Sequence, residues 1–338
     1  MRYRQLGRSG LLVSELALGT MVFGEESQRS TSPEIAEKII HRFLDAGGNH
    51  IDTANVYADG RSEEIVGKAI KNKREQVVLA TKMRFRSGGD GPNDLGLSRY
   101  HIIHSVEASL KRLGTETIDL LYMHCWDPIA PIEESLRAFD DLVAAGKVRY
   151  IGVSNFKAWQ LMKALGLSDA NGWARFVAAQ YQYSLVARDI EPEFSDLCLS
   201  EGVGITPWGP LGGGFLTGKY QPGNKPQEGR IAIMPAETEE TWDRRNTERN
   251  WSILEVVSNL ASKYQAAHSQ IAVAWLLVQP AVASVIVGVR TLEQLEDNLG
   301  AVNIHLKPEE LEALDQVSAL EERYPYRFIK QYGARKVM

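Results

Sequence analysis

Short apolar runs alternate with amphipathic stretches along nearly the whole chain. We interpret eight of these runs as strands, because they are short and rich in β-branched residues. Helix-like segments separate them, so the pattern predicts repeated βα units and a parallel sheet. The eight predicted strands are Leu16–Gly19, His50–Thr53, Val77–Lys82, Ile118–His124, Tyr150–Ser154, Phe176–Gln180, Gly204–Trp208 and Ser284–Gly288.

Three of the amphipathic stretches carry recognisable signals for the start and the end of a helix. Serine or proline precedes each one, and glycine follows, as expected for residues that cap helices. The starts lie at Ser32, Ser98 and Pro131, and the ends lie at Gly47, Gly114 and Gly146.

Eight βα units in one chain predict a (β/α)₈ barrel, a TIM barrel, that fills residues 1–338 as a single domain. An open, doubly wound sheet is the second interpretation. Residues 3–19 contain a glycine turn between two short alternating runs, which predicts a β-hairpin that caps the N-terminal end of the barrel. Residues 220–247 are polar and lack periodicity, so we expect a long loop after the seventh strand.

The charge balance narrows the classes of partner. Lys and Arg number 38 against 43 Asp and Glu, which gives a net charge of −5. This balance disfavours a nucleic-acid partner, because such proteins hold the phosphate backbone with an excess of basic residues. We expect a small-molecule partner instead, and the sequence leaves a homo-oligomer open.

Two features bear on where the protein works. Cys125 and Cys198 are too few for a disulfide framework and stand in no metal-binding spacing, so we expect a cytoplasmic protein without a metal site. No apolar segment of a secretory signal follows the arginines of residues 1–10. Residues 271–289 carry no charge, but Pro280 interrupts them, which predicts a buried helix and strand rather than a membrane contact.

Ionisable side chains end successive predicted strands, where a barrel builds its site. Asp52 ends the second strand with Tyr57 in the following loop, Lys82 ends the third, and His124 ends the fourth. An ammonium beside a phenol lowers the phenol's pKa from its ordinary value near 10 and so makes it a better general acid. Asp52 would hold Lys82 charged, and His124 would orient a substrate carbonyl. The set predicts a proton donor beside a carbonyl, and it requires a separate source of hydride.

The sequence lacks the motifs of the two common nucleotide-binding folds, the Rossmann fold and the P-loop fold. No G-x-G-x-x-G follows a predicted strand, which disfavours a Rossmann domain. Gly213–Lys219 satisfies G-x-x-x-x-G-K, but Tyr220 stands where a Walker motif has Ser or Thr, and Pro222 prevents the helix that would follow. We interpret the segment as a glycine-rich loop with a lysine, suited to a pyrophosphate but not to hydrolysis of a nucleoside triphosphate.

The chain resembles the aldo-keto reductase superfamily over nearly its whole length. The similar segments include ALGTMVFG, IDTANVYADGRSEEIVGKAI, LATKM, TPWGPLGGGFLTGKY and VIVGVRTLEQLEDNLGA. GLSRYHI and the end of the eighth strand resemble the branch with bacterial reductases and potassium-channel β subunits. The resemblance implies that NADP(H) reduces an aldehyde or ketone, with Tyr57 as general acid or base, Lys82 and Asp52 tuning it, and His124 orienting the carbonyl.

The resemblance also implies a set of residues that bind NADP(H). Ser154, Asn155 and Gln180 would bind the carboxamide of the nicotinamide, and Trp208 would stack on its ring. Arg290 would contact the 2′-phosphate and so favour NADP(H) over NAD(H), since a phosphate offers charge-assisted hydrogen bonds. Pro210, Leu211, Gly213 and Lys219 would line the pyrophosphate; Gln294, Asp297 and Asn298 would surround the adenosine; Thr20, Met21, Asp52, Gly209 and Gly288 complete the set.

Three functions compete on this evidence. The first is an NADP(H)-dependent carbonyl reductase. The second is an NADP(H)-binding regulatory subunit resembling the channel β subunits, although those typically lack the histidine that this chain keeps at His124. The third is an aldolase-like barrel in which Lys82 forms a Schiff base. Each residue also has a structural interpretation, such as a buried Asp52–Lys82 ion pair or a core histidine at His124.

Overall fold

The computed structural model describes residues 1–24, 30–86 and 88–333. Its centre is a parallel sheet of eight strands, in the order β10-β3-β4-β5-β6-β7-β8-β9. Each strand pairs with its neighbour along the chain, as repeated right-handed βα units require. The strands are β3 (Leu16–Gly19), β4 (His50–Asp52), β5 (Val78–Met83), β6 (Ile118–Met123), β7 (Val148–Ser154), β8 (Phe176–Gln180), β9 (Gly204–Ile205) and β10 (Val285–Gly288).

Backbone hydrogen bonds close this sheet into a ring. Ile205 N donates to Ala281 O over 2.7 Å, and Ala283 N donates to Ile205 O over 2.8 Å. Further along, Ile286 N donates to Pro207 O over 2.9 Å. The predicted (β/α)₈ barrel is therefore confirmed, and the open sheet is excluded. β9 is shorter than the predicted Gly204–Trp208, because Pro207 has no N–H to donate to a ladder.

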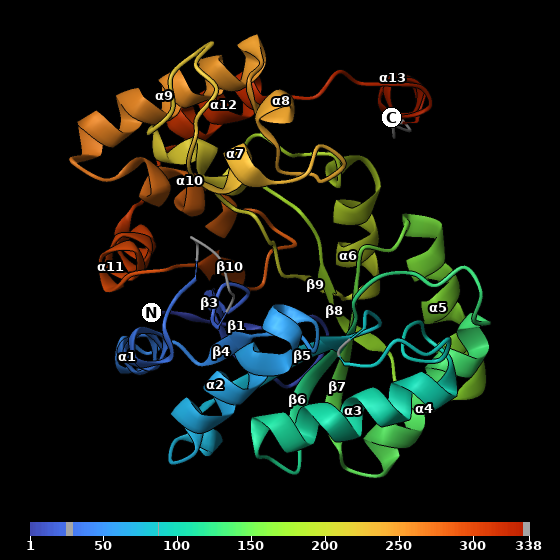
Figure 1. Ribbon diagram of the computed structural model, residues 1–338. Coiled ribbons are helices and arrows are strands. Elements are labelled where there is room, and N and C mark those ends of the chain that lie inside the picture. Colours follow the sequence, from blue (N-terminus) through green and yellow to red (C-terminus); the bar gives the residue numbers. More distant parts are fainter. Residues whose placement is uncertain (25–29, 87, 334–338) are drawn as a thin grey trace.

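Helices surround the barrel (Figure 1). The predicted caps are present: the Ser32 and Ser98 hydroxyls accept from the N–H groups of Ile35 and His101, and Gly114 takes a left-handed conformation with φ of 61°. The first helices are α1 (Pro33–Asp45), α2 (Arg61–Ile70), α3 (Arg99–Leu113), α4 (Ile132–Ala144), α5 (Ala158–Asn171) and α6 (Asp196–Glu201). The later ones are α9 (Glu248–Tyr264), α10 (His268–Leu277), α11 (Leu292–Gly300), α12 (Pro308–Ser318) and α13 (Tyr326–Tyr332).

The predicted hairpin is present and closes one end of the barrel. β1 (Tyr3–Gln5) pairs antiparallel with β2 (Leu12–Ser14). Leu6 and Val13 form one apolar cluster with inward side chains of the barrel strands, among them Leu120 and Tyr122. Burial of this cluster stabilises the end of the barrel opposite the site and fills its interior there.

Residues 220–247 differ in part from the predicted long loop. They contain two short helices, α7 (Arg230–Ile233) and α8 (Trp242–Arg245). Glu240, Trp242 and Arg245 are buried, at 2%, 4% and 5% exposure. Sequence periodicity misses such a segment, because helices of one turn carry no repeat and their burial depends on distant contacts. The predicted helix and strand of residues 271–289 are present as α10 and β10, and no helix among the described residues is long and apolar enough to span a bilayer.

Candidate active site

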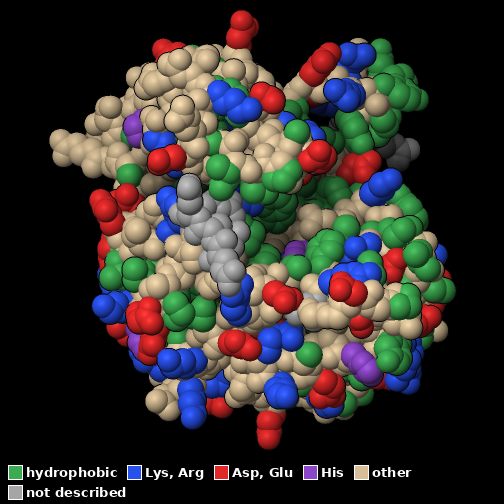
Figure 2. Space-filling model, viewed as in Figure 1, with side chains coloured by type: hydrophobic (Ala, Val, Ile, Leu, Met, Phe, Trp, Pro, Cys, Tyr) green, Lys and Arg blue, Asp and Glu red, His purple; other side chains and the backbone are tan. Residues whose placement is uncertain are grey.

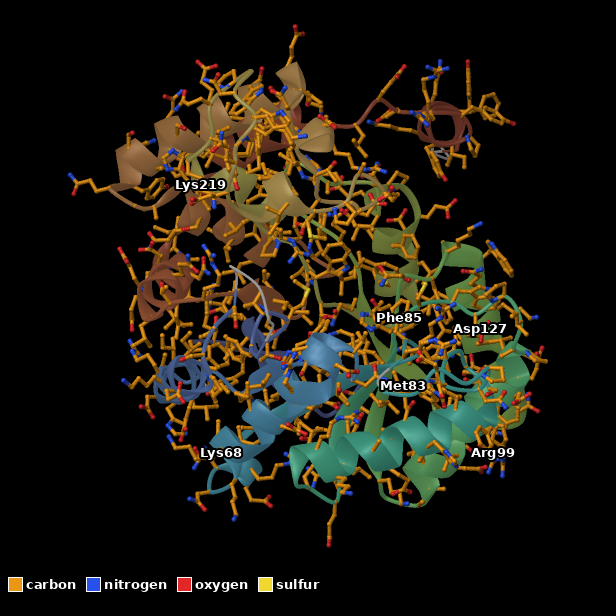
Figure 3. All side chains as sticks on the ribbon, viewed as in Figure 1. Lys68, Met83, Phe85, Arg99, Asp127 and Lys219 are labelled. Carbon is orange, nitrogen blue, oxygen red and sulfur yellow. The ribbon has the colours of Figure 1, made fainter. Side chains whose placement is uncertain are left out.

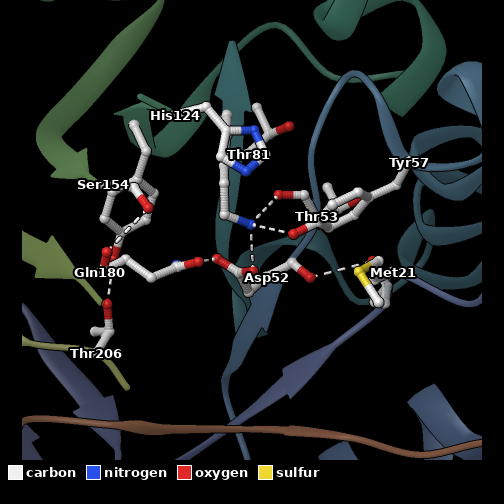
Figure 4. A network of polar contacts seen from close by, with 12 residues as sticks. Met21, Asp52, Thr53, Tyr57, Thr81, His124, Ser154, Gln180 and Thr206 are labelled. Atoms are coloured by element: carbon white, nitrogen blue, oxygen red, sulfur yellow. Dashed lines mark hydrogen bonds and ion pairs between the residues drawn. The ribbon is translucent and has the colours of Figure 1, made fainter. Parts of the chain in front are cut away.

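The four ionisable residues predicted at the strand ends meet at the C-terminal end of the barrel (Figure 4). Lys82 is fully buried, and its Nζ donates to Asp52 Oδ1 over 2.5 Å, to Thr53 O over 2.8 Å and to Tyr57 Oη over 3.1 Å. Three acceptors thus satisfy all three ammonium protons. Burial alone would lower the pKa of Lys82, but Asp52 and Tyr57 outweigh it and raise that pKa. The lysine is held protonated against the phenol oxygen.

His124 stands over this group as a neutral side chain. Its ring centroid lies 6.1 Å from that of Tyr57, nearly edge-on. Burial, then the charges of Lys82 and Arg84, lower the pKa of His124 well below its usual value. Nδ1 is buried and has no hydrogen-bond partner among the described residues. A neutral imidazole carries one N–H, and an unpartnered Nδ1 is tolerated best as a lone pair, which assigns the proton to Nε2.

A second layer of hydrogen bonds fixes the carboxylate of Asp52 from below. Gln180 Nε2 donates to Asp52 Oδ2 over 2.8 Å, so each carboxylate oxygen has its own donor. The Tyr122 hydroxyl lies 3.0 Å from Thr206 Oγ1 and is fully buried. Burial raises the pKa of Tyr122, so it stays protonated. Its ring occupies the space of a side chain at Gly152, where a Cβ would lie 2.5 Å from the ring.

The structure places the residues predicted to bind the nicotinamide carboxamide around the same opening. Ser154 Oγ donates to the backbone oxygen of Gln180 over 2.9 Å. Asn155 Nδ2 donates to Ser154 Oγ and to His124 O, each over 2.9 Å. Asn155 has a φ of 54°, a left-handed conformation that asparagine tolerates better than most residues. This conformation turns its amide back across the end of β6.

The glycine-rich loop after β9 begins at the same opening. Trp208 is half-buried, and its backbone N–H donates to Tyr181 O over 2.8 Å. Gly209 has a φ of 65°, and a Cβ there would lie 2.8 Å from Glu240 Oε1. Gly213 has a φ of 71°, and a Cβ there would lie 2.6 Å from Ile231 Cγ2. Glycine is required at both positions, because it accepts a positive φ and has no Cβ to clash. The glycines therefore set the backbone path of this loop, which also contains Pro210 and Leu211.

Two cations converge at the far end of this loop. Burial lowers the pKa of Lys219, and the nearby charge of Arg290 lowers it further. In the part of the chain that the structure describes, neither side chain makes an ion pair with a carboxylate. Like charges held together without a counter-ion fit a ligand that carries phosphates. The donor set and the glycine-rich loop therefore suit a dinucleotide.

The remaining predicted residues lie on the elements that border these two groups. Thr20 Oγ1 donates to Asp52 O over 3.1 Å and is hydrogen-bonded to the Ser62 hydroxyl over 2.8 Å. Gln294 Oε1 accepts from Arg290 N over 2.9 Å at the start of α11. Gly288 ends β10, and Asp297 and Asn298 lie on α11, the first exposed and the second buried. The structure brings the predicted set to one end of the barrel, while their roles toward a ligand stay predictions.

Sequence reasoning missed one pair of residues at this end. Arg230 and the buried Glu240 form an ion pair, and Arg230 Nη1 lies 3.8 Å from Met21 Sδ. Glu240 also touches the space above Gly209, so the pair fastens residues 230–240 over the glycine-rich loop. The one signal in the sequence is Trp242, a large aromatic residue inside an otherwise polar stretch.

The chain belongs to the aldo/keto reductase family, whose model matches residues 15–319. An Arabidopsis thaliana protein named "Probable voltage-gated potassium channel subunit beta" is 37% identical over 96% of this chain and 99% of its own. An "Uncharacterized oxidoreductase YrpG" of Bacillus subtilis is 38% identical over 94% of this chain and 96% of its own. "Versiconal hemiacetal acetate reductase" of Aspergillus parasiticus is 35% identical over 94% of this chain and 96% of its own. The family and its oxidoreductase relatives support an oxidoreductase.

Proposed function

We propose that the protein is an NADP(H)-dependent reductase that converts the carbonyl of an aldehyde or ketone to an alcohol. The observation that carries the proposal is the buried ammonium of Lys82, held between Asp52 Oδ1 at 2.5 Å and Tyr57 Oη at 3.1 Å. A charged donor on the phenol oxygen stabilises the phenolate that forms when the phenol gives up its proton. This is the property that a general acid at this position needs.

The residues then have separate tasks. Tyr57 gives its proton to the carbonyl oxygen and regains one from solvent. The neutral His124 donates a hydrogen bond from Nε2 to the same oxygen, which orients the carbonyl and stabilises the charge that develops on it. Trp208, the glycine-rich loop, Lys219 and Arg290 would hold the dinucleotide. NADPH supplies the hydride that the protein's own side chains cannot.

The geometry argues against Lys82 as a Schiff-base nucleophile. An amine attacks a carbonyl only in its neutral form, and such lysines have lowered pKa values. Lys82 instead has a raised pKa and three acceptors around its ammonium. A regulatory subunit like the one named for the Arabidopsis relative is the second candidate, and measured turnover separates it from the reductase.

The test is reduction of 4-nitrobenzaldehyde by NADPH, compared between the wild type and Tyr57→Phe. We expect Tyr57→Phe to lower kcat about a thousandfold, since general acid catalysis contributes roughly 10² to 10⁴. NADPH affinity, read from quenching of tryptophan fluorescence, should stay within twofold, and Tyr100→Phe on the exposed face of α3 serves as the matched control. Normal turnover by Tyr57→Phe would refute the mechanism. NADPH binding without turnover of any carbonyl by the wild type would favour the regulatory subunit.

A further inference from the structure

Arg84 follows β5 directly and lies beside the proposed site. Its Cζ is 5.0 Å from the centroid of the Phe85 ring, and that ring is 4.9 Å from the ring of His124, edge to face. Because both groups contact the same Phe85 ring, the guanidinium and the imidazole lie near each other. The charge of Arg84 also acts on His124, whose pKa it helps to lower. Arg84 is therefore a cation at the mouth of the pocket in which the carbonyl would bind.

The backbone holds this position firmly. Gly96 N donates to Arg84 O over 2.8 Å, and Asn55 Nδ2 donates to Phe85 O over 3.1 Å. The loops after β4 and β5 thus fix the backbone of both residues before any ligand arrives. A backbone that is fixed in advance lowers the conformational entropy lost when the side chain binds a ligand.

The guanidinium of Arg84 lacks a counter-ion. Within residues 1–24, 30–86 and 88–333, it makes no ion pair, and its Nε is buried without a hydrogen-bond partner. The neighbouring Arg86 pairs with Asp90 over 3.7 Å, so that carboxylate is already engaged. The other carboxylates of the adjoining loops accept backbone N–H groups instead: Asp59 from Gly88, Asp94 from Gly91 and Asp127 from Leu97. A half-buried cation that stacks on an aromatic ring but has no carboxylate beside it gains from a ligand that supplies the anion.

Arg84 is separate from the cations that suit the dinucleotide. Figure 3 shows Phe85 at the end of β5 and Lys219 well away from it in the upper part of the molecule. Figure 2 shows the hollow between these two regions, with apolar side chains along its walls. Arg84 therefore belongs to the side where Phe85 and His124 lie, and Lys219 to the other.

We propose that Arg84 forms an anion subsite, and that the substrate is an aldehyde or ketone that also carries a carboxylate. This inference rests on the proposed carbonyl reductase. One planar guanidinium matches the charge and the two oxygens of one carboxylate. The Phe85 ring, placed between the guanidinium and the imidazole, provides an apolar surface for the carbon skeleton that joins the two ends of such a substrate.

The test uses two substrates of similar shape, 4-carboxybenzaldehyde and methyl 4-formylbenzoate, which differ in charge. The quantity is the ratio of their kcat/KM values, so a general loss of activity or stability cancels. We expect the wild type to favour the acid about tenfold or more, because hydrogen bonds between charged groups are the strong ones. Arg84→Gln should bring the ratio close to one, Arg84→Lys should keep part of the preference, and Arg86→Gln should keep all of it.

Two outcomes would overturn the anion subsite: a wild-type ratio of one, or an unchanged ratio in Arg84→Gln. If neither aldehyde is reduced, the proposed function fails, and calorimetric titration with benzoate and benzamide still decides on the subsite. Benzoate should then bind the wild type about tenfold more tightly than Arg84→Gln, while benzamide should not distinguish them. Equal benzoate affinities for the two proteins would refute it.

Discussion

The two ends of the barrel treat buried charge in opposite ways. At the N-terminal end, Asp119 accepts from Arg74 and Arg149, each over 2.7 Å, and from Leu79 N over 2.9 Å. Glu15 is fully buried there and pairs with Arg2 and Arg4. At the C-terminal end, within the described ranges, His124 Nδ1 and Arg84 Nε have no hydrogen-bond partner, and the cations Lys219 and Arg290 form no ion pair.

This difference suggests that the N-terminal end of the barrel serves stability and the C-terminal end serves ligand binding. Charges that are fully paired inside the protein need no ligand, so the N-terminal end contributes stability alone. Unpaired groups at the other end raise the free energy of the protein without ligand, and a ligand that pairs them gains that free energy on binding. Two groups at the C-terminal end are paired: Arg230 with Glu240, and Lys82 with Asp52 and Tyr57. The proposed mechanism needs the charges of the second group placed before the substrate arrives.

Removing a buried ion pair at the N-terminal end should have the largest effect on the free energy of unfolding. We expect Asp119→Ala to lower the free energy of unfolding by about 3 kcal/mol, because it leaves two arginines and a buried N–H without their acceptor. Urea denaturation measures this change. Asp45→Ala is the control, since its pair with Lys73 is exposed and should contribute less than about 1 kcal/mol. Equal losses in the two variants would contradict the role given to the buried pair.

A second effect on stability should appear in acid and arise from His50, which lies in the barrel interior below Asp52. Ser284 Oγ donates to Ser14 O, so His50 Nδ1 must donate to Ser284 Oγ over 3.0 Å, which leaves Nε2 a buried lone pair. Burial lowers the pKa of His50 to about 4. The unfolded chain binds this proton near pH 6.5 and the folded chain does not, so stability falls as the pH drops from 6.5 to 4.

The variant His50→Asn isolates this contribution, because asparagine keeps a donor for Ser284 and does not titrate. Between pH 7 and pH 5, we expect the loss of unfolding free energy to be about 2 kcal/mol smaller in His50→Asn than in the wild type. Denaturant unfolding at the two pH values gives both losses. The same loss in both proteins would show that His50 does not titrate on unfolding.

The sequence allowed prediction of the parts of the molecule that depend on local pattern. The eight strands, the caps at Ser32 and Ser98 and the meeting of Asp52, Lys82 and His124 all follow from apolar runs and from what ends them. Arg230 and Glu240 could not be predicted in this way, since a charged residue in a polar stretch gives no sign that it is buried. That Arg84 has no counter-ion among the described residues depends on what Asp59, Asp94 and Asp127 in the adjoining loops bind instead, which only the folded chain reveals.

The smallest expected effect in this comparison concerns the unpaired end. If Arg290 contacts the 2′-phosphate as proposed, Arg290→Ala removes one charge-assisted contact, so it should weaken NADPH binding about tenfold and change NADH binding less than twofold. Tryptophan fluorescence titrations with both cofactors measure the preference, and Arg99→Ala on α3, far from the loop, is the control. The free energy of unfolding should hold or rise slightly, since Lys219 loses a like-charged neighbour. Equal weakening of both cofactors would place Arg290 away from the 2′-phosphate, and a clear loss of stability would show that it is paired within the fold.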